Sequence, residues 1–285
     1  MKVSITILFM ALTLRAAFCA ESETVGVLIQ QGDAQVANHQ LRAALETFQK
    51  AGKLEPDNPD VLVRTSKQCG ELIADAKSPS EARFLAETAF ADAKRAVELA
   101  PDHAKAHLCL AIAYGRMTDY TSNRVKIEYS KFIRDETLKS LALDPTDEYA
   151  WHVIGRWHAG ISGLNFLLKF FTKLVYGGLP DASYEEAAKY LKKAAEIAPQ
   201  RILHHQELAK VYVALGKRSL AEKEWQAVLK ILPADADDVK ARREAKHGLG
   251  SDSNLRASAR QPASNPIPPL AVIVPSRWTP VTASR

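Results

Sequence analysis

The chain has 285 residues, 47% of them hydrophobic and 25% charged, which is ordinary for a soluble globular protein with a substantial core. Its formal net charge of +5 lies at the two ends, because residues 1–20 hold two basic residues and no acidic one, and residues 249–285 hold four arginines and one aspartate. The middle of the chain is therefore close to neutral, which argues against a nucleic acid as the partner although the sequence pI is near 9.0.

The first twenty residues have the pattern of a secretory signal peptide. Lys2 precedes an apolar run over residues 3–14, and Arg15 precedes small residues at 16–20. This order is typical of an export signal, and the apolar run is too short to span a membrane. We therefore expect residues 1–20 to be cleaved and the mature protein to be periplasmic or secreted. If the N-terminus is not cleaved, we expect a cytoplasmic or organelle-associated protein.

Five prolines then set a period along the chain. Each ends a similar phrase, as in Glu-Leu-Ala-Pro101 and Glu-Ile-Ala-Pro199. Because a proline cannot continue a helix, each unit stops at a fixed place. The five are Pro56, Pro101, Pro145, Pro199 and Pro233, at intervals of 45, 44, 54 and 34 residues.

The last interval, residues 202–233, shows the unit in full. It reads as two helices joined at Gly216, with small residues at Ala209 and Ala221 that let the helices approach closely. Tyr212 and Trp225 fill the volume between neighbouring pairs of helices. Small and large residues recur at the same spacing in the earlier intervals.

This pattern resembles the tetratricopeptide repeat, a helix–turn–helix of 34 residues that buries its apolar face only by stacking on its neighbours. The resemblance implies an all-α, right-handed solenoid of about five helical hairpins over residues 21–248. Cys69 and Cys109 fall on apolar helix faces, so we expect both to be small buried side chains rather than parts of a disulfide framework. Residues 249–285 are rich in Ser, Pro, Ala and Arg, and we expect a disordered tail there.

The segment 164–176 departs from the repeat pattern. It is apolar nearly all round as a helix, so we expect it to be buried or docked, and it is too short to span a bilayer, which needs roughly 20 residues. The simpler interpretation is that it fills the core. The alternative is that Phe166, Leu167 and Phe171 line a cavity for the acyl chains of a lipid.

Residues 122–233 carry a set of more specific phrases. In this region the chain resembles the regulator of microtubule dynamics family, whose members carry a divergent tetratricopeptide-like domain. The resemblance implies a role linked to microtubules, spindle poles or mitochondria, and one member of the family has been associated with phospholipid binding. The matching phrases are Lys126-Ile127-Glu128, Leu141-Ala142-Leu143-Asp144-Pro145, Ile154-Gly155-Arg156-Trp157, Tyr176-Gly177-Gly178-Leu179-Pro180, Tyr184-Glu185-Glu186-Ala187 and Leu208-Ala209-Lys210-Val211-Tyr212.

The sequence shows no set of residues typical of an enzyme active site. The segment Gly160-Ile161-Ser162-Gly163 lacks the spacing of a nucleophile elbow, and there is no glycine-rich phosphate loop. His103 and His107 are four residues apart, but no third ligand accompanies them, so we expect packing roles rather than a metal site. We predict a non-enzymatic protein without a metal or cofactor.

In tetratricopeptide arrays the first helix of each hairpin lines a concave groove. Mapped onto this chain, the groove positions predict a basic, partly aromatic surface that suits an acidic peptide or a phosphate headgroup, because arginine offers bidentate hydrogen bonds. Alternatively, these positions are ordinary solvated helix faces. We therefore predict a protein- or peptide-binding scaffold, with lipid binding or lipid transfer as the alternative. The groove residues are Lys105, Arg116, Tyr149, His152, Arg156, Gln206 and Lys210.

Overall fold

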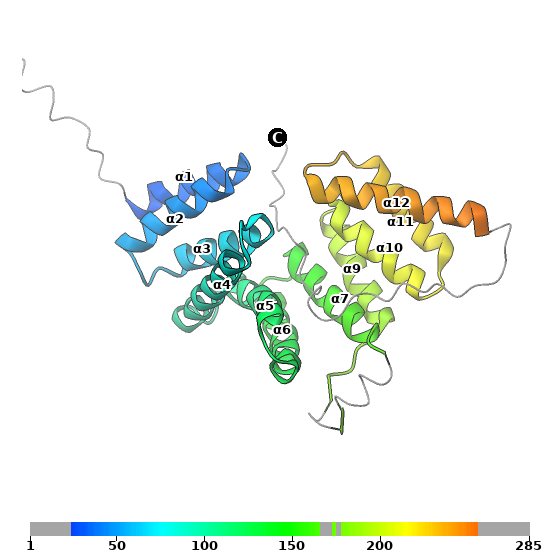
Figure 1. Ribbon diagram of the computed structural model, residues 1–285, viewed down its shortest axis with the longest axis horizontal. Coiled ribbons are helices and arrows are strands. Elements are labelled where there is room, and N and C mark those ends of the chain that lie inside the picture. The colour runs from blue at the N-terminus through cyan, green and yellow to red at the C-terminus, as the bar shows by residue number, and fades with distance from the viewer. Residues whose placement is uncertain (1–23, 166–172, 175–177, 256–285) are drawn as a thin grey trace, which may run out of the picture.

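The structure is a computed structural model that describes residues 24–165, 173–174 and 178–255, with side chains as far as residue 250 (Figure 1). All regular elements in these ranges are helical. They are α1 (Val25–Ala37), α2 (Leu41–Leu54), α3 (Pro59–Leu72), η1 (Ile73–Asp75), α4 (Pro79–Leu99), α5 (Ala104–Met117), η2 (Thr118–Tyr120), α6 (Asn123–Leu143), α7 (Glu148–Ser162), α9 (Tyr184–Ile197), α10 (Ile202–Ala214), α11 (Arg218–Lys230) and α12 (Ala236–Leu255).

The helices pair into five hairpins, α1/α2, α3/α4, α5/α6, α7/α9 and α10/α11, and α12 packs against α11. Each hairpin stacks on the next, so the chain winds as a solenoid (Figure 1). Some first helices also touch the first helix of the next unit, as α3 touches α5 and as α10 touches α7 and α12. These first helices line the inner face of the solenoid, which we call the concave face. The predicted all-α repeat solenoid of about five hairpins is confirmed.

The residue two places after a repeat proline starts each first helix. The side chains of Asn58, His103 and Asp147 accept hydrogen bonds from backbone amides in the first turns of α3, α5 and α7. Asp235 does the same for α12, with a bond of 2.9 Å, so α12 begins as the first helix of a sixth unit would. At α10 this residue is Arg201, which makes no capping bond.

Three consecutive residues near the middle of α7 belong to the phrase that the sequence singled out. A Cβ atom on Gly155 would lie 2.7 Å from Cγ of Leu191, so only a glycine lets α7 approach α9 this closely. Trp157 is fully buried, and its Nε1 donates to the carbonyl oxygen of Ser130 in α6 at 2.8 Å. Arg156 points toward α10, as described below.

A ring N–H group on three first helices reaches back to the proline that ended the previous unit. Nε2 of His107 lies 2.7 Å from the carbonyl oxygen of Pro101, and Nε1 of Trp151 donates to Pro145 at 2.9 Å. Nε2 of His205 lies 3.0 Å from the carbonyl oxygen of Pro199. Each of these rings therefore fixes the turn before its helix.

Cys69 and Cys109 are free and buried, as predicted. Burial raises the pKa of each thiol to about 12, so both stay protonated and unreactive in the folded protein. The helix α12 continues past residue 248, where the tail was expected to begin, as far as Leu255. Gly248 lies inside this helix. A larger residue would not fit at this position, because a Cβ atom there would be 2.9 Å from Nε1 of Trp225.

Candidate functional site

The structure distributes the seven predicted groove residues over two parts of the concave face and one exposed position. Lys105 is exposed in the first turn of α5. Arg116 and Tyr149 border a cavity, whereas Arg156, Gln206 and Lys210 belong to a network of ion pairs, and His152 belongs to a buried histidine pair.

The network joins α7, α10 and α12, and we call it the α7–α10–α12 network. Nη1 of Arg156 lies 2.5 Å from Oε2 of Glu207, and Nζ of Lys210 lies 3.1 Å from Oε1 of the same carboxylate. Lys210 also lies 3.1 Å from Oε2 of Glu244, which accepts a second hydrogen bond of 2.8 Å from Nε2 of Gln206. Every long polar side chain of this set is therefore engaged within the chain.

Burial makes this network a structural element. The side chains of Arg156 and Glu207 are each only 9% exposed. Burial acts most strongly on Glu207 and opposes its ionisation, but Arg156 and Lys210 outweigh it and hold the pKa of Glu207 below its ordinary value. Arg156 and Lys210 thus neutralise internal carboxylates, and in the described structure they do not form a free basic surface.

His152 and His204 form a buried pair between α7 and α10. Their Nδ1 atoms are 3.1 Å apart, and both side chains are fully buried. Burial, reinforced by Arg156 and Arg201, lowers the pKa of His152 well below 6.5, and burial does the same to the pKa of His204. Both rings are therefore neutral at pH 7. Within the described part of the chain, neither Nε2 atom has a hydrogen-bond partner.

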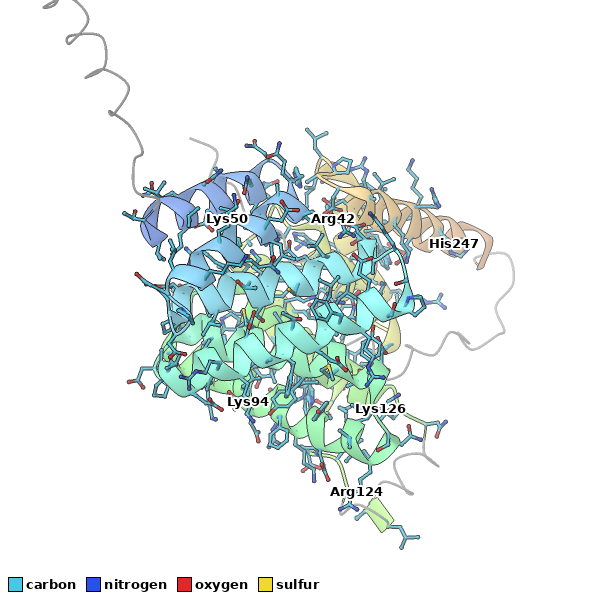
Figure 2. The ribbon with its side chains drawn as sticks, turned by 60° about the vertical axis from the view of Figure 1, so that its left-hand side comes forward. Arg42, Lys50, Lys94, Arg124, Lys126 and His247 are labelled. Atoms are coloured by element: carbon cyan, nitrogen blue, oxygen red, sulfur yellow. The ribbon has the colours of Figure 1, made fainter. Side chains whose placement is uncertain are left out.

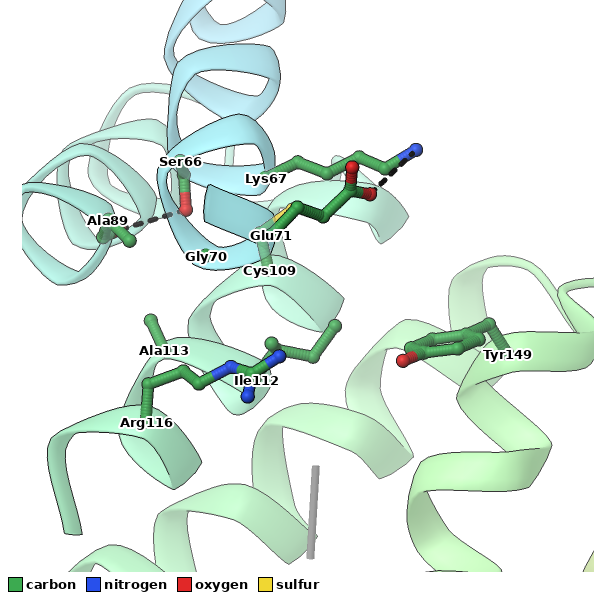
Figure 3. Close-up of a pocket in the computed structure, with 10 residues that line it drawn as sticks. All are labelled: Ser66, Lys67, Gly70, Glu71, Ala89, Cys109, Ile112, Ala113, Arg116 and Tyr149. Atoms are coloured by element: carbon green, nitrogen blue, oxygen red, sulfur yellow. Dashed lines mark hydrogen bonds and ion pairs between the residues drawn. The ribbon is translucent and has the colours of Figure 1, made fainter. Parts of the chain in front are cut away.

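A small cavity opens on the concave face between α3, α5 and α7 (Figure 3). It encloses about 20 Å³, which is room for about one water molecule. Figure 3 shows the hydroxyl end of Tyr149 pointing toward the guanidinium of Arg116. The small residues Ser66, Gly70, Ala89 and Ala113 line it together with Cys109, Ile112, Lys67, Glu71, Arg116 and Tyr149.

Charged side chains from distant parts of the sequence surround this cavity. Nζ of Lys67 lies 3.8 Å from Oε1 of Glu71. Burial lowers the pKa of Lys67 and of Arg116, and raises the pKa of Tyr149. The field at Arg116 includes Glu71 of α3 and Asp237 of α12, which are far apart in the sequence.

One position of the repeat explains why the cavity lies where it does. The residue eleven places after each repeat proline points to the concave face, and these five residues form what we call the inner column. Four of them have long charged side chains, whereas the one on α5 has a short apolar side chain, which leaves space beside it. The inner column is Lys67, Ile112, Arg156, Lys210 and Glu244.

Sequence reasoning missed several members of the site. Lys67 and Glu71 were not considered, because the first helix after Pro56 departs from the repeat pattern at other positions. Arg201 lies 3.2 Å from Glu148 and so ties the start of α10 to the start of α7. The signal that could have found it is a cation at the start of a helix, where the helix dipole disfavours positive charge.

The outer face of the solenoid differs from the concave face. The exposed basic residues Arg42, Lys50 and Lys94 lie far apart on α2 and α4 (Figure 2), and Arg42 pairs with Glu81 at 2.9 Å. Over the described residues, no three His, Cys, Asp or Glu side chains are grouped as a metal site would need. The candidate site is therefore on the concave face.

The lipid alternative depends on residues that the structure does not describe. Phe166, Leu167 and Phe171 lie outside the described ranges, as does the expected signal peptide 1–20. Among the described helices, each is too short or too polar to cross a bilayer. The predicted lipid cavity stays a prediction.

Comparison with solved structures shows the fold. A thermophilic TPR protein from Thermus thermophilus superposes with a TM-score of 0.58 over 79% of this chain and 99% of its own. The two are 17% identical, so the similarity concerns the solenoid alone. It agrees with the repeat architecture described above.

Comparison with curated proteins identifies relatives. Regulator of microtubule dynamics protein 1 of Mus musculus is 29% identical over 180 residues, which is 63% of this chain and 58% of the mouse protein. Regulator of microtubule dynamics protein 3 of Xenopus laevis is 23% identical over 218 residues, which is 74% of this chain and 46% of the frog protein. The chain thus spans about half the length of these relatives.

These relatives overturn the predicted export of the mature chain. They are eukaryotic proteins named as regulators of microtubule dynamics, and microtubules are polymers of the cytoplasm. A periplasmic or secreted protein does not meet them. The prediction of a periplasmic or secreted protein is therefore wrong. The apolar run near the N-terminus was misinterpreted, because several kinds of N-terminal segment contain such a run.

The family model described as Regulator of microtubule dynamics protein 1-3 matches residues 28–252. This range contains every phrase on which the resemblance was based, including Gly155, Arg156 and Trp157, whose contacts with three other helices explain why they occur together. Because the match covers most of the sequence, the chain belongs to the regulator of microtubule dynamics family.

Proposed function

We propose that the chain is a non-enzymatic protein-binding scaffold whose concave face binds an extended segment of a partner protein. The family and the repeat fold support the scaffold role, since stacked hairpins create an extended inner surface. The observation that carries the finer proposal is the cavity between α3, α5 and α7, where Lys67, Arg116 and Tyr149 from three helices meet above a floor of small residues.

The chemistry of these groups favours an acidic segment. The ammonium of Lys67 and the guanidinium of Arg116 are donors without acceptor capacity, and arginine binds a carboxylate through two parallel hydrogen bonds. Glu71 beside them limits the net positive charge, so the site suits one or two carboxylates rather than a polyanion. The names of the relatives, regulators of microtubule dynamics, support a partner that belongs to the microtubule system.

A labelled peptide with alternating Glu and Gly tests the proposal by fluorescence anisotropy with the full chain. Arg116→Gln removes a charge at the cavity, and Gly70→Leu fills it, because no other atom lies within 4 Å of a Cβ atom built on Gly70. We expect each variant to bind at least tenfold more weakly, with an unchanged circular dichroism spectrum. Co-sedimentation with polymerised tubulin then tests the microtubule link.

The matched control is Lys94→Gln, which removes one positive charge from the exposed outer face of α4 (Figure 2). We expect it to bind the peptide as the parent does. An equal loss in Lys94→Gln and Arg116→Gln would show that the peptide follows overall charge, and the concave site would be wrong. Failure of the parent chain to bind at millimolar peptide would contradict the acidic segment.

A further inference from the structure

Carboxylates from the second hairpin and from α12 lie near the concave site. Glu71 and the exposed Asp75 lie at the end of α3 and in η1, and the exposed Asp237 lies in the first turn of α12. Glu71 and Asp237 both contribute to the field at Arg116, although they are far apart in the sequence. In Figure 1 the start of α12 faces the α3 side across the inner face. We call the two exposed carboxylates, Asp75 and Asp237, the acidic rim.

A segment of this same chain has the complementary charge. Residues 256–285, which lie beyond the described structure, contain four arginines and no aspartate or glutamate. Guanidinium groups pair with carboxylates more strongly than neutral donors do. The segment also contains six prolines, which fix φ and lower the conformational entropy lost when a peptide binds in extended form.

The geometry of α12 lets this segment reach the rim. The helix has 20 residues, so it is about 30 Å long, and its first turn is the end that faces the concave site. A chain that leaves at Leu255 must therefore return about 30 Å, which roughly ten extended residues cover. The segment 256–285 is long enough with residues to spare.

We propose that residues 256–285 bind across the acidic rim of their own solenoid and occupy the mouth of the concave site. The covalent tether gives such a segment an effective concentration in the millimolar range, so even weak ion pairs keep it bound. The inference concerns the regulation of the site under the proposed function: a partner segment must displace the internal one. The occupant is the chain's own segment and not an external peptide.

The test cuts the full chain in place. A protease site inserted between Leu255 and Arg256 is cleaved after folding, and equilibrium dialysis at about 1 mM protein, which matches the effective concentration of the tether, and at about 50 mM salt shows whether the fragment stays with the solenoid. We expect the fragment to be retained at this low salt and released at about 1 M salt, because salt screens exposed charges. Separation at low salt, with the solenoid still helical, overturns the proposal.

Charge variants locate the contact. We expect Asp75→Lys combined with Asp237→Lys to release the fragment at low salt, whereas Asp102→Lys, at an exposed site in the turn before α5, should retain it. Equal retention in all three proteins overturns the rim as the binding surface. A dimer that persists on dilution would place the segment on a second copy and overturn the internal arrangement. No partner protein takes part, so failure here leaves the anisotropy test of partner binding unaffected.

Discussion

The two parts of the concave face use the same kinds of side chain with opposite results. In the α7–α10–α12 network, Arg156 and Lys210 meet Glu207 and Glu244, and the inner face is filled. Between α3, α5 and α7 the inner column has Ile112 in place of a charged residue, and a cavity remains. Whether a groove position is filled or borders a cavity therefore depends on the side chain that the neighbouring repeat supplies beside it.

The largest effect is expected in the filled part. Glu207→Leu leaves Arg156 buried without its partner, and breaking a buried pair costs about 3–5 kcal/mol of the free energy of unfolding. Urea unfolding measures this loss. Combining Glu207→Leu with Arg156→Met should recover most of it, since an apolar pair of similar volume needs no neutralisation. A double variant as unstable as the single one would show that the loss in Glu207→Leu does not come from the unpaired charge of Arg156.

A glycine in each part allows the same substitution to be compared. Gly155→Ala places a methyl group against Leu191 and should cost about 1–3 kcal/mol, as overpacking does. Gly70→Ala has no neighbour within 4 Å and should be neutral or stabilise by up to about 1 kcal/mol, because alanine favours the helix. Thermal unfolding of the two variants measures the contrast, and equal destabilisation would contradict the difference in packing.

The buried histidine pair gives the filled part a pH dependence of its own. The folded-state pKa values of His152 and His204 lie below 6.5, so below that pH the unfolded chain binds more protons. The stability is therefore fully present above pH 6.5 and falls as the pH falls, by up to about 1.4 kcal/mol per pH unit for each ring. Urea unfolding at about pH 7 and about pH 6, on either side of the ordinary histidine pKa, measures this slope.

A double variant isolates the contribution of the pair. His152→Phe with His204→Leu should be less sensitive to acid than the parent chain over this interval. The difference between the two proteins is the quantity to compare, because burial raises the pKa of Asp92 to about 6 and its contribution has the opposite sign. Identical slopes would show that the pair is not the sensitive group.

The smallest effect tests a feature common to both parts. Trp151→Phe removes the hydrogen bond to the carbonyl oxygen of Pro145 and should cost about 0.5–1.5 kcal/mol. Trp151→His should cost less than Trp151→Phe, because His107 and His205 make the same bond at the equivalent position in their repeats. Chemical denaturation measures both, and a larger loss in Trp151→His would assign the role of Trp151 to ring volume alone.

The fold was predictable because its determinants are local and periodic. The prolines ended the units where expected, the small residues at Ala209 and Ala221 are buried between helices, and the cysteines are buried. The roles of Arg156 and Lys210 were not predictable, because whether a cation faces solvent or a carboxylate depends on how far successive hairpins rotate. Glu207 lies in the repeat after that of Arg156, and a sequence alone does not state that the two helices bring them together.

The run Gly155-Arg156-Trp157 has a consequence for how the chain unfolds. Side chains leave a helix about 100° apart, so three consecutive residues contact α9, α10 and α6 in turn. In an ordinary repeat array each unit is stabilised by its neighbours, and the ends open independently. Here the third, fourth and fifth hairpins are joined through one helix, so they should exchange their amide hydrogens together as one cooperative block, while α1 and α2 open alone.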